Sequence, residues 1–105
     1  MDYSTFDFYS QALGGAVEKS ITSHEYGVFL RELRAARVQV GLTQVDLATR
    51  LGETQSFISK CERGERRLDI LELRVFCRAI GLSLSGFVQR LERRLASESR
   101  GDARQ

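Results

Sequence analysis

Four of the six glycines between residues 26 and 95 divide this stretch into short segments, and a helix-capping residue follows each of the four. Glycine ends helices because it adopts positive φ at little cost, and Ser, Thr and Asp side chains accept hydrogen bonds from the free N–H groups of a first turn. The chain contains no proline, the strongest helix breaker. This alternation of glycines and helix-capping residues predicts an all-α fold. The glycines are Gly41, Gly52, Gly64 and Gly81, and the expected caps are Thr43, Thr54, Asp69 and Ser83 or Ser85.

The segments between these marks have the apolar periodicity of helices. Apolar residues recur every three or four positions, which places them on one helix face. A chain of 105 residues suffices for one domain with a small core, so we expect a compact five-helix domain. The predicted helices are residues 26–40, 44–51, 55–63, 70–80 and a fifth from Ser83 or Ser85 to about Leu95, and the inner face of the first comprises Phe29, Leu30, Leu33, Ala36, Arg37 and Val40.

Residues 1–22 and 96–105 differ from the domain predicted at residues 23–95. The N-terminal extension is aromatic, and Gly14-Gly15 interrupts any helix there, so we expect a short helix or a packed arm. Ser23 is a possible cap of the first helix. The last ten residues are polar and are expected to form a fraying tail.

Charge is distributed unevenly along the chain. Residues 1–27 hold one base and four acids, whereas residues 28–105 hold fifteen bases and ten acids. A basic domain behind an acidic leader favours a polyanionic partner for the domain.

Several classes of function lack the residues they need. One histidine, His24, and no clustered carboxylates in an apolar context leave no catalytic set and no metal or cofactor site. Cys61 and Cys77 lie in apolar helical patterns and are expected to be buried free thiols. No apolar run reaches the roughly 18 residues of a membrane span, and the acidic start is unlike a signal peptide. We expect a cytoplasmic protein, bacterial or phage-encoded, that is not an enzyme.

The segment from Gln44 to Arg63 fits a helix-turn-helix, in which a tight turn joins two short helices. Ala48 supplies the small residue where the helices face each other, and Gly52 supplies a turn residue that tolerates positive φ. Apolar side chains must fill the angle between the helices, and the sequence offers Leu47, Leu51, Ile58 and Cys61 for this.

Residues 30–91 resemble the Cro/lambda-repressor-like (XRE) helix-turn-helix family. The resemblance rests on the full order of Gly41-Leu42-Thr43-Gln44, Glu62-Arg63-Gly64 and Ile80-Gly81-Leu82-Ser83 around the motif. It implies a lambda-repressor-like fold and a sequence-specific regulator of transcription, a repressor that binds double-stranded DNA. It also implies base contacts at Gln55, Ser56 and Lys60, a phosphate-binding and bracing role for Gln44, and a buried ion pair between Arg37 and Glu62.

The outer face of the third predicted helix carries hydrogen-bonding side chains and no acid. Glutamine pairs with adenine, lysine reaches guanine, and serine suits either base in the major groove. The alternative is an ordinary solvated polar face. The residues expected to read bases are Gln55, Ser56, Ser59 and Lys60.

Phosphate contacts are expected on both sides of this helix. Thr43 and Gln44 open the second helix, and free N–H groups at a helix N-terminus bind anions. Arg63, Arg66 and Arg67 follow the third helix, where cations suit phosphates, although a solvated loop is the alternative. Phe57 either covers the edge of the core near Leu68 or touches a thymine methyl group, and we favour the core.

Dimerisation is expected because one short helix covers little DNA. The candidate residues on the fifth helix are Val88, Leu91 and Leu95. Packing of these residues onto the domain's own core is the alternative, and the aromatic residues in 1–22 are a second candidate for the dimer contact. A second hypothesis for function is an antitoxin-like regulator that holds a second protein through residues 1–22. A third is an interaction module that does not bind DNA, because a fold does not fix function.

Overall fold

The computed structural model describes residues 24–103, which form five α-helices and no strand. The helices are α3 (His24–Gln39), α4 (Gln44–Leu51), α5 (Gln55–Glu62), α6 (Ile70–Ile80) and α7 (Leu84–Ala103). The expected all-α, five-helix fold is confirmed. The expectations for residues 1–22 and for Ser23 fall outside the described residues.

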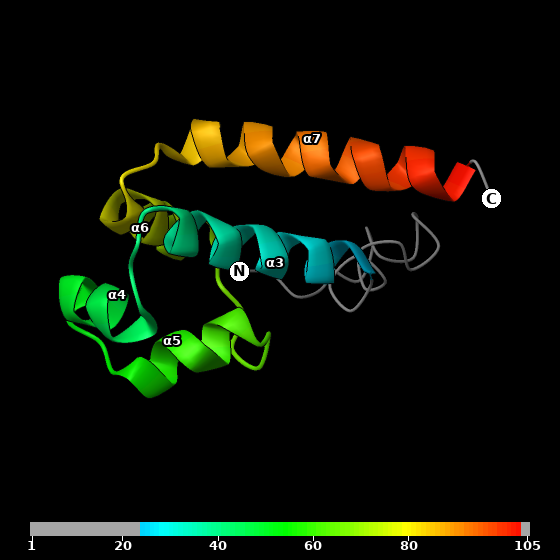
Figure 1. Cartoon of the computed structure of the whole chain (residues 1–105). Coiled ribbons are helices and arrows are strands. Elements are labelled where there is room, and N and C mark those ends of the chain that lie inside the picture. Colours follow the sequence, from blue (N-terminus) through cyan, green and yellow to red (C-terminus); the bar gives the residue numbers. More distant parts are fainter. Residues whose placement is uncertain (1–23, 104–105) are drawn as a thin grey trace, which may run out of the picture.

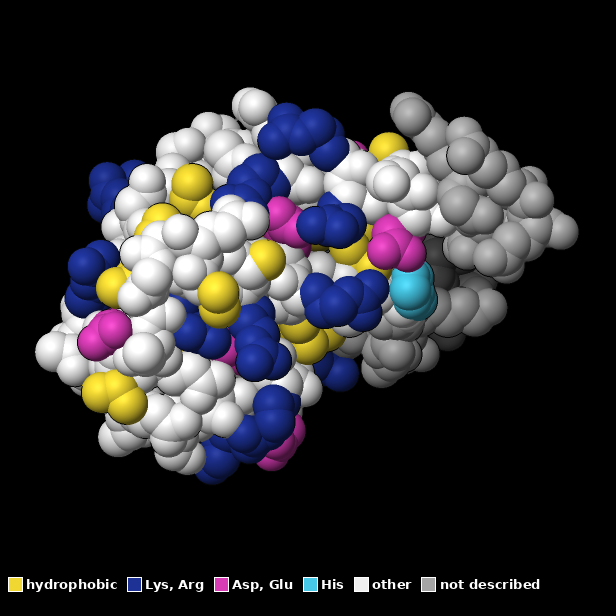
Figure 2. All heavy atoms as spheres, in the orientation of Figure 1, with side chains coloured by type: hydrophobic (Ala, Val, Ile, Leu, Met, Phe, Trp, Pro, Cys, Tyr) yellow, Lys and Arg dark blue, Asp and Glu magenta, His cyan; other side chains and the backbone are white. Residues whose placement is uncertain are grey.

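Figure 1 shows two long helices, α3 and α7, side by side, with the short pair α4 and α5 against the other side of α3. Helix α6 packs against both α4 and α7 and so connects the two parts. Lys and Arg side chains are spread over α7, α3 and α5 on the face seen in Figure 2.

The caps form as the sequence predicts. Thr43, Thr54 and Asp69 each accept a hydrogen bond from a backbone N–H of the following first turn. Before α7 the cap is Ser83, whose Oγ accepts from the backbone N–H of Gly86 at 3.0 Å. At α4 the cap is reciprocal: Thr43 donates its backbone N–H to the Asp46 carboxylate, and this bond lowers the pKa of that carboxyl group.

Two of the four glycines show why the turns need this residue. Gly52 ends α4 at φ 68°, in the left-handed region, where it closes the turn between α4 and α5. Gly64 follows α5 at φ 80°, and a Cβ there would lie 2.9 Å from Cδ1 of Leu30. The chain thus returns from α5 close against α3.

Four helix limits differ from the sequence prediction: both ends of α3, the end of α5 and the end of α7. Helix α3 starts at His24 and ends at Gln39, so Val40 lies past its end and is 52% exposed, not on the inner face. Helix α5 ends one residue early because Arg63 is its C-cap.

The predicted end of the fifth helix near Leu95 is wrong, since α7 continues to Ala103. One polar residue of the predicted tail, Glu98, pairs with α3, as does Arg94 one turn before it. Glu98 lies 3.2 Å from His24 and 3.9 Å from Arg31, and Arg94 lies 3.3 Å from Glu32. These contacts extend α7 along α3.

The core lies where α3, α4, α5, α6 and α7 meet. Phe87 of α7 is fully buried, and its ring meets the ring of Phe29 edge-on at 6.0 Å. Phe57 packs on Phe76 at 6.4 Å and is partly buried at the edge of the core, which agrees with the favoured role. The buried members of the core are Leu33, Ala36, Leu47, Ala48, Ile58, Cys61, Leu73, Phe76, Cys77, Ile80 and Phe87.

Both cysteines should report on unfolding. Cys61 and Cys77 are free and fully buried, and burial raises the pKa of both thiols. Because the thiolate is the reactive form, we expect the native protein to react with a disulfide reagent such as DTNB no faster than it unfolds, and to titrate two thiols at once in denaturant. Thr49→Cys, at an exposed position, is the control and should react at once in native protein. Fast reaction of the unmodified chain would contradict the buried placement.

Candidate nucleic-acid interface

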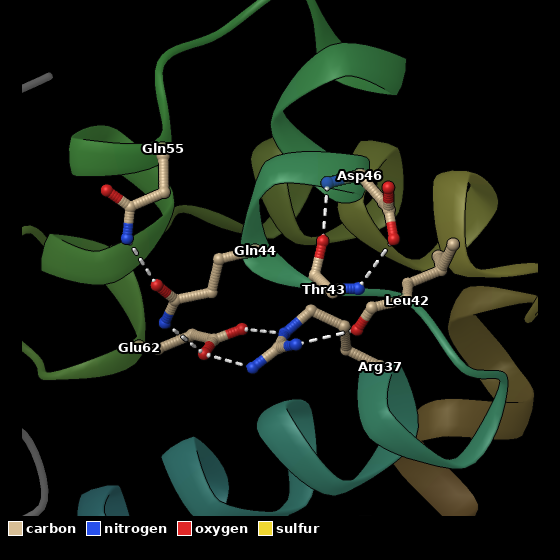
Figure 3. A network of polar contacts seen from close by, with 7 residues as sticks. All are labelled: Arg37, Leu42, Thr43, Gln44, Asp46, Gln55 and Glu62. Carbon is tan, nitrogen blue, oxygen red and sulfur yellow. Dashed lines mark hydrogen bonds and ion pairs between the residues drawn. The ribbon is translucent and has the colours of Figure 1, made fainter.

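A chain of hydrogen bonds links α3, α4 and both ends of α5 (Figure 3). Arg37 donates from Nε and Nη2 to the two carboxylate oxygens of Glu62, at 2.6 and 3.0 Å. The Glu62 Oε1 atom also accepts from Nε2 of Gln44 at 3.0 Å. Gln44 in turn accepts, through its Oε1, a hydrogen bond of 2.7 Å from Nε2 of Gln55.

The ion pair at the centre of this chain is buried. The Arg37 and Glu62 side chains are only 7% and 4% exposed. A buried pair is tolerated when its remaining polar atoms are also bonded, and here Nη1 of Arg37 donates to the Leu42 carbonyl oxygen at 2.7 Å. Two parallel bonds between a guanidinium and a carboxylate also fix orientation. The pair therefore holds the last turn of α5 against α3 and against the residues that lead into α4.

The first turn of α5 is held by the same chain. Gln55 is the first residue of this helix, and its bond to Gln44 ties it to the start of α4. Leu47 of α4 and Ile58 and Cys61 of α5 lie buried between the two helices. Helix α5 is thus fixed at both ends and along its inner face, which leaves its outer face in a defined orientation.

Three of the four expected base-reading residues share that outer face. Gln55, Ser56 and Lys60 are exposed, and α5 has no acidic residue in its first turn. Ser59 is half-buried, and its hydroxyl accepts a hydrogen bond from Nη1 of Arg63. Ser59 is therefore coupled to the C-cap of the helix.

The three arginines after α5 are placed differently. Arg63 also donates to Glu65 and lowers the pKa of that carboxyl group. Arg67 is exposed, and its side chain makes no hydrogen bond or ion pair to the described residues.

Arg66 is turned toward α6. It lies 2.6 Å from a carboxylate oxygen of Glu72, which lowers the pKa of Glu72, and it lies over the ring of Phe57 at 5.3 Å. The sequence does not indicate that Glu72 pairs with Arg66. Glu72 lies three residues after Asp69, a spacing that predicts a capping box at the start of α6, and Glu72 forms that capping box as well. A phosphate contact by Arg66 has to compete with Glu72.

Sequence reasoning missed Arg34. This exposed residue lines a surface hollow together with Thr43, Gln44, Val45 and Gln55. The available signal was its spacing of three residues from Arg31 on the outer face of α3, a feature that apolar periodicity does not reveal.

Comparison with known proteins agrees with this arrangement. A family model described as helix-turn-helix matches residues 33–87. Among solved structures, an XRE-family like protein from Pseudomonas syringae pv. tomato str. DC3000 is 45% identical, with a TM-score of 0.65 over 72% of this chain and 93% of that chain. The chain belongs to the XRE family of helix-turn-helix proteins. Members of this family are DNA-binding transcription regulators rather than enzymes, and their helix-turn-helix domains bind double-stranded DNA.

A search of the curated proteins found no match for this XRE-family chain. No helix among residues 24–103 is long and apolar enough to cross a membrane. The same residues contain no group of three or more His, Cys, Asp or Glu side chains that could hold a metal ion.

The buried pair of this XRE-family chain can be tested by stability. Arg37→Met strands the Glu62 carboxylate, and we expect a loss of about 3–5 kcal/mol in the free energy of unfolding, measured in urea. Arg34→Met, on the exposed side of the same helix, is the matched control and should stay within about 0.5 kcal/mol of the parent. An Arg37→Met variant as stable as the parent would show that the pair does not hold α5 in place.

Proposed function

We propose that this chain is a sequence-specific transcriptional repressor that binds an inverted-repeat operator as a homodimer. The observation that carries the proposal is the outer face of α5, which is exposed and free of acid, on a helix fixed at both ends by the Arg37–Glu62–Gln44–Gln55 chain. A rigid helix that presents Gln, Ser and Lys suits the donor and acceptor pattern of the major groove.

In this proposal the base contacts come from Gln55, Ser56, Ser59 and Lys60. Gln55 pairs with adenine, Lys60 reaches guanine, and Ser56 adapts to either base. Ser59 serves the contact less directly, since it is half-buried and bonded to Arg63.

Phosphate contacts set the register of the helix in the groove. Thr43 and Gln44 present the N-terminus of α4, where free N–H groups and the helix dipole favour an anion. Arg63 and Arg67 are exposed beyond the other end of α5. Arg66 contributes after it releases Glu72.

A dimer places two copies of α5 about 34 Å apart, one helical turn of DNA. Of the three candidates on α7, Val88 is 37% exposed, whereas Leu95 is half-buried and Leu91 packs against the core of its own domain. We therefore assign the main apolar contact to Val88, with Leu91 and Leu95 beside it.

Selection from random duplex DNA tests sequence recognition. The full chain should enrich an inverted repeat, and Gln55→Ala or Lys60→Ala should weaken binding to it by about 1–3 kcal/mol. Arg74→Ala is the control for charge, because this exposed residue of α6 lies on a helix that takes no part in the proposed DNA contacts.

Two results would contradict the proposal. Equal losses on the enriched duplex and on random DNA would exclude base reading by these side chains. No enrichment at all would favour a regulator that needs a second protein, the role that the sequence suggests for residues 1–22.

The dimer contact has its own measurement. Val88→Glu places a charge in the proposed apolar interface, and we expect sedimentation to show a shift from dimer to monomer, with weaker binding to the inverted repeat and an unchanged melting temperature at low concentration. Gln89→Glu, at the next position of α7, which is also exposed, is the control. A Val88→Glu variant that remains fully dimeric would move the interface elsewhere.

A further inference from the structure

A group of five arginines lies on α3 and α7. They are Arg31 and Arg34 of α3 and Arg90, Arg93 and Arg94 of α7, called here the arginine band. In Figure 2, dark blue side chains extend without a wide gap from α7 across α3 to α5 on one face of the molecule.

The carboxylates within the band neutralise only part of its charge. Glu32 is 5% exposed, and its two carboxylate oxygens accept from Nε of Arg90 at 3.0 Å and from Nε of Arg94 at 3.3 Å. Glu98 meets Arg31 at 3.9 Å. Within residues 24–103, two carboxylates therefore pair with a band of five guanidinium groups, and the band keeps an excess of positive charge at its surface.

Two members of the band have no such partner. The side chains of Arg34 and Arg93 are exposed and make no hydrogen bond or ion pair with any residue in the described range 24–103. Arg90, by contrast, is 22% exposed and bonds to Glu32 and to Gln39. Arg90 thus balances Glu32, while Arg34 and Arg93 are available to an external anion.

Residues of the band line three surface hollows, one of them beside the helix-turn-helix. Arg34 lines the first together with Thr43, Gln44 and Gln55. Arg31, Glu32 and Arg94 line the second, and Arg90, Arg93, Arg94 and Ser97 line the third, which measures about 270 Å³. The second and third hollows share Glu32 and Arg94. The first hollow shares no residue with them, and it is related to them through Arg34, which lies three residues from Arg31 on α3.

We propose that the arginine band binds backbone phosphates of the DNA that flanks each operator half-site. The inference rests on the proposed function, because the position of the band matters only when α5 lies in the major groove. The strand that passes the N-terminus of α4 reaches Arg34 next, and DNA beyond the half-site then lies over Arg31, Arg93 and Arg94. Phosphates suit arginine forks.

The makeup of the band favours DNA over a protein partner. Protein interfaces have an apolar centre, whereas Glu32, Arg90, Arg93, Arg94 and Ser97 line the third hollow. The apolar residues of the second hollow are Val28, which is buried, and Ala35, which is half-buried. The first hollow, beside α4, does include the exposed Val38 and Val45. The arginines of the second and third hollows have no exposed apolar centre, so they bind through charge and carry no base sequence information.

Two duplexes test the proposal. The short one ends at the outer base pairs of the inverted repeat recovered by selection, and the long one adds one helical turn, about ten base pairs, of random sequence on each side. The full chain should bind the long duplex roughly tenfold more tightly, with a steeper dependence on salt.

The variant Arg34→Ala/Arg93→Ala should lose most of the advantage of the long duplex. Its slope of log K against log salt on the long duplex should fall by about 0.9 for each phosphate that a subunit no longer binds. Arg34 lies beside Gln44 and Gln55, so binding to the short duplex weakens as well, and the ratio of the two affinities measures the flanking contact. Its matched control is Arg74→Ala/Arg78→Ala, which removes the same charge from exposed positions on α6. Arg34→Lys/Arg93→Lys should keep most of the advantage, because lysine retains the charge.

The outcomes separate the band from the proposed function. Equal affinity of the unmodified chain for both duplexes overturns the band and leaves operator binding intact. An equal loss in the α6 control also overturns it, because net charge alone then explains the effect. If selection enriches no duplex, the proposed function fails first and the flanking contact fails with it.

Discussion

The carboxylate of Glu62 is the point on which the orientation of α5 depends. It joins three separate parts of the chain, because it binds Arg37 of α3 and Gln44 of α4 and belongs to the last turn of α5. A hydrophobic contact in the same place would hold the helices together without fixing their rotation, since apolar packing has little directional preference. Bonds to both carboxylate oxygens restrict that rotation, and a helix that reads base edges needs this restriction.

The rest of the domain supports this arrangement from the opposite side. Core residues of α6 and α7, among them Phe87, pack together with those of α3 and fix its position. Helix α3 in turn holds Arg37 next to Glu62. Helix α7 continues past the core, where Arg94 and Glu98 pair with α3. The pairs at that far end are more exposed than the Arg37–Glu62 pair, and exposed pairs contribute little to stability. The half of α7 near Phe87 is therefore the part that holds α3.

Most of the helix limits could be predicted because they depend on local chemistry. Glycines with positive φ and Thr or Asp caps act within one turn, so Gly52, Thr54 and Asp69 mark the same ends in the sequence and in the structure. The end of α7 could not be found in this way, because what extends it is contact with α3, distant in sequence. Ser97 and Glu98 are polar, as the residues of a disordered tail are, but they belong to α7.

The candidate site also has features that the sequence predicts and features that depend on contacts between distant segments. The exposed face of α5 follows from helical spacing, and the Arg37–Glu62 contact follows from the family resemblance. The pairing of Arg66 with Glu72 and the position of Arg34 beside Gln44 depend on how loops and helices meet, which spacing does not encode. The sequence therefore suggests three equivalent arginines after α5, whereas Arg66 is already engaged by α6.

The bond between Gln44 and Gln55 also has a direction, and the charge of Arg37 sets it. Beside Arg37, Glu62 can only accept, so Gln44 must offer it an N–H and turn its own oxygen toward Gln55. Gln55 must then give one N–H to Gln44, which leaves its carbonyl oxygen and its second N–H. An acceptor beside a donor complements the N6 and N7 atoms of adenine, whereas guanine presents two acceptors there. In the proposed base contact, the charge of Arg37 on α3 thus decides, through the amide groups of Gln44 and Gln55, which atoms Gln55 offers to a base.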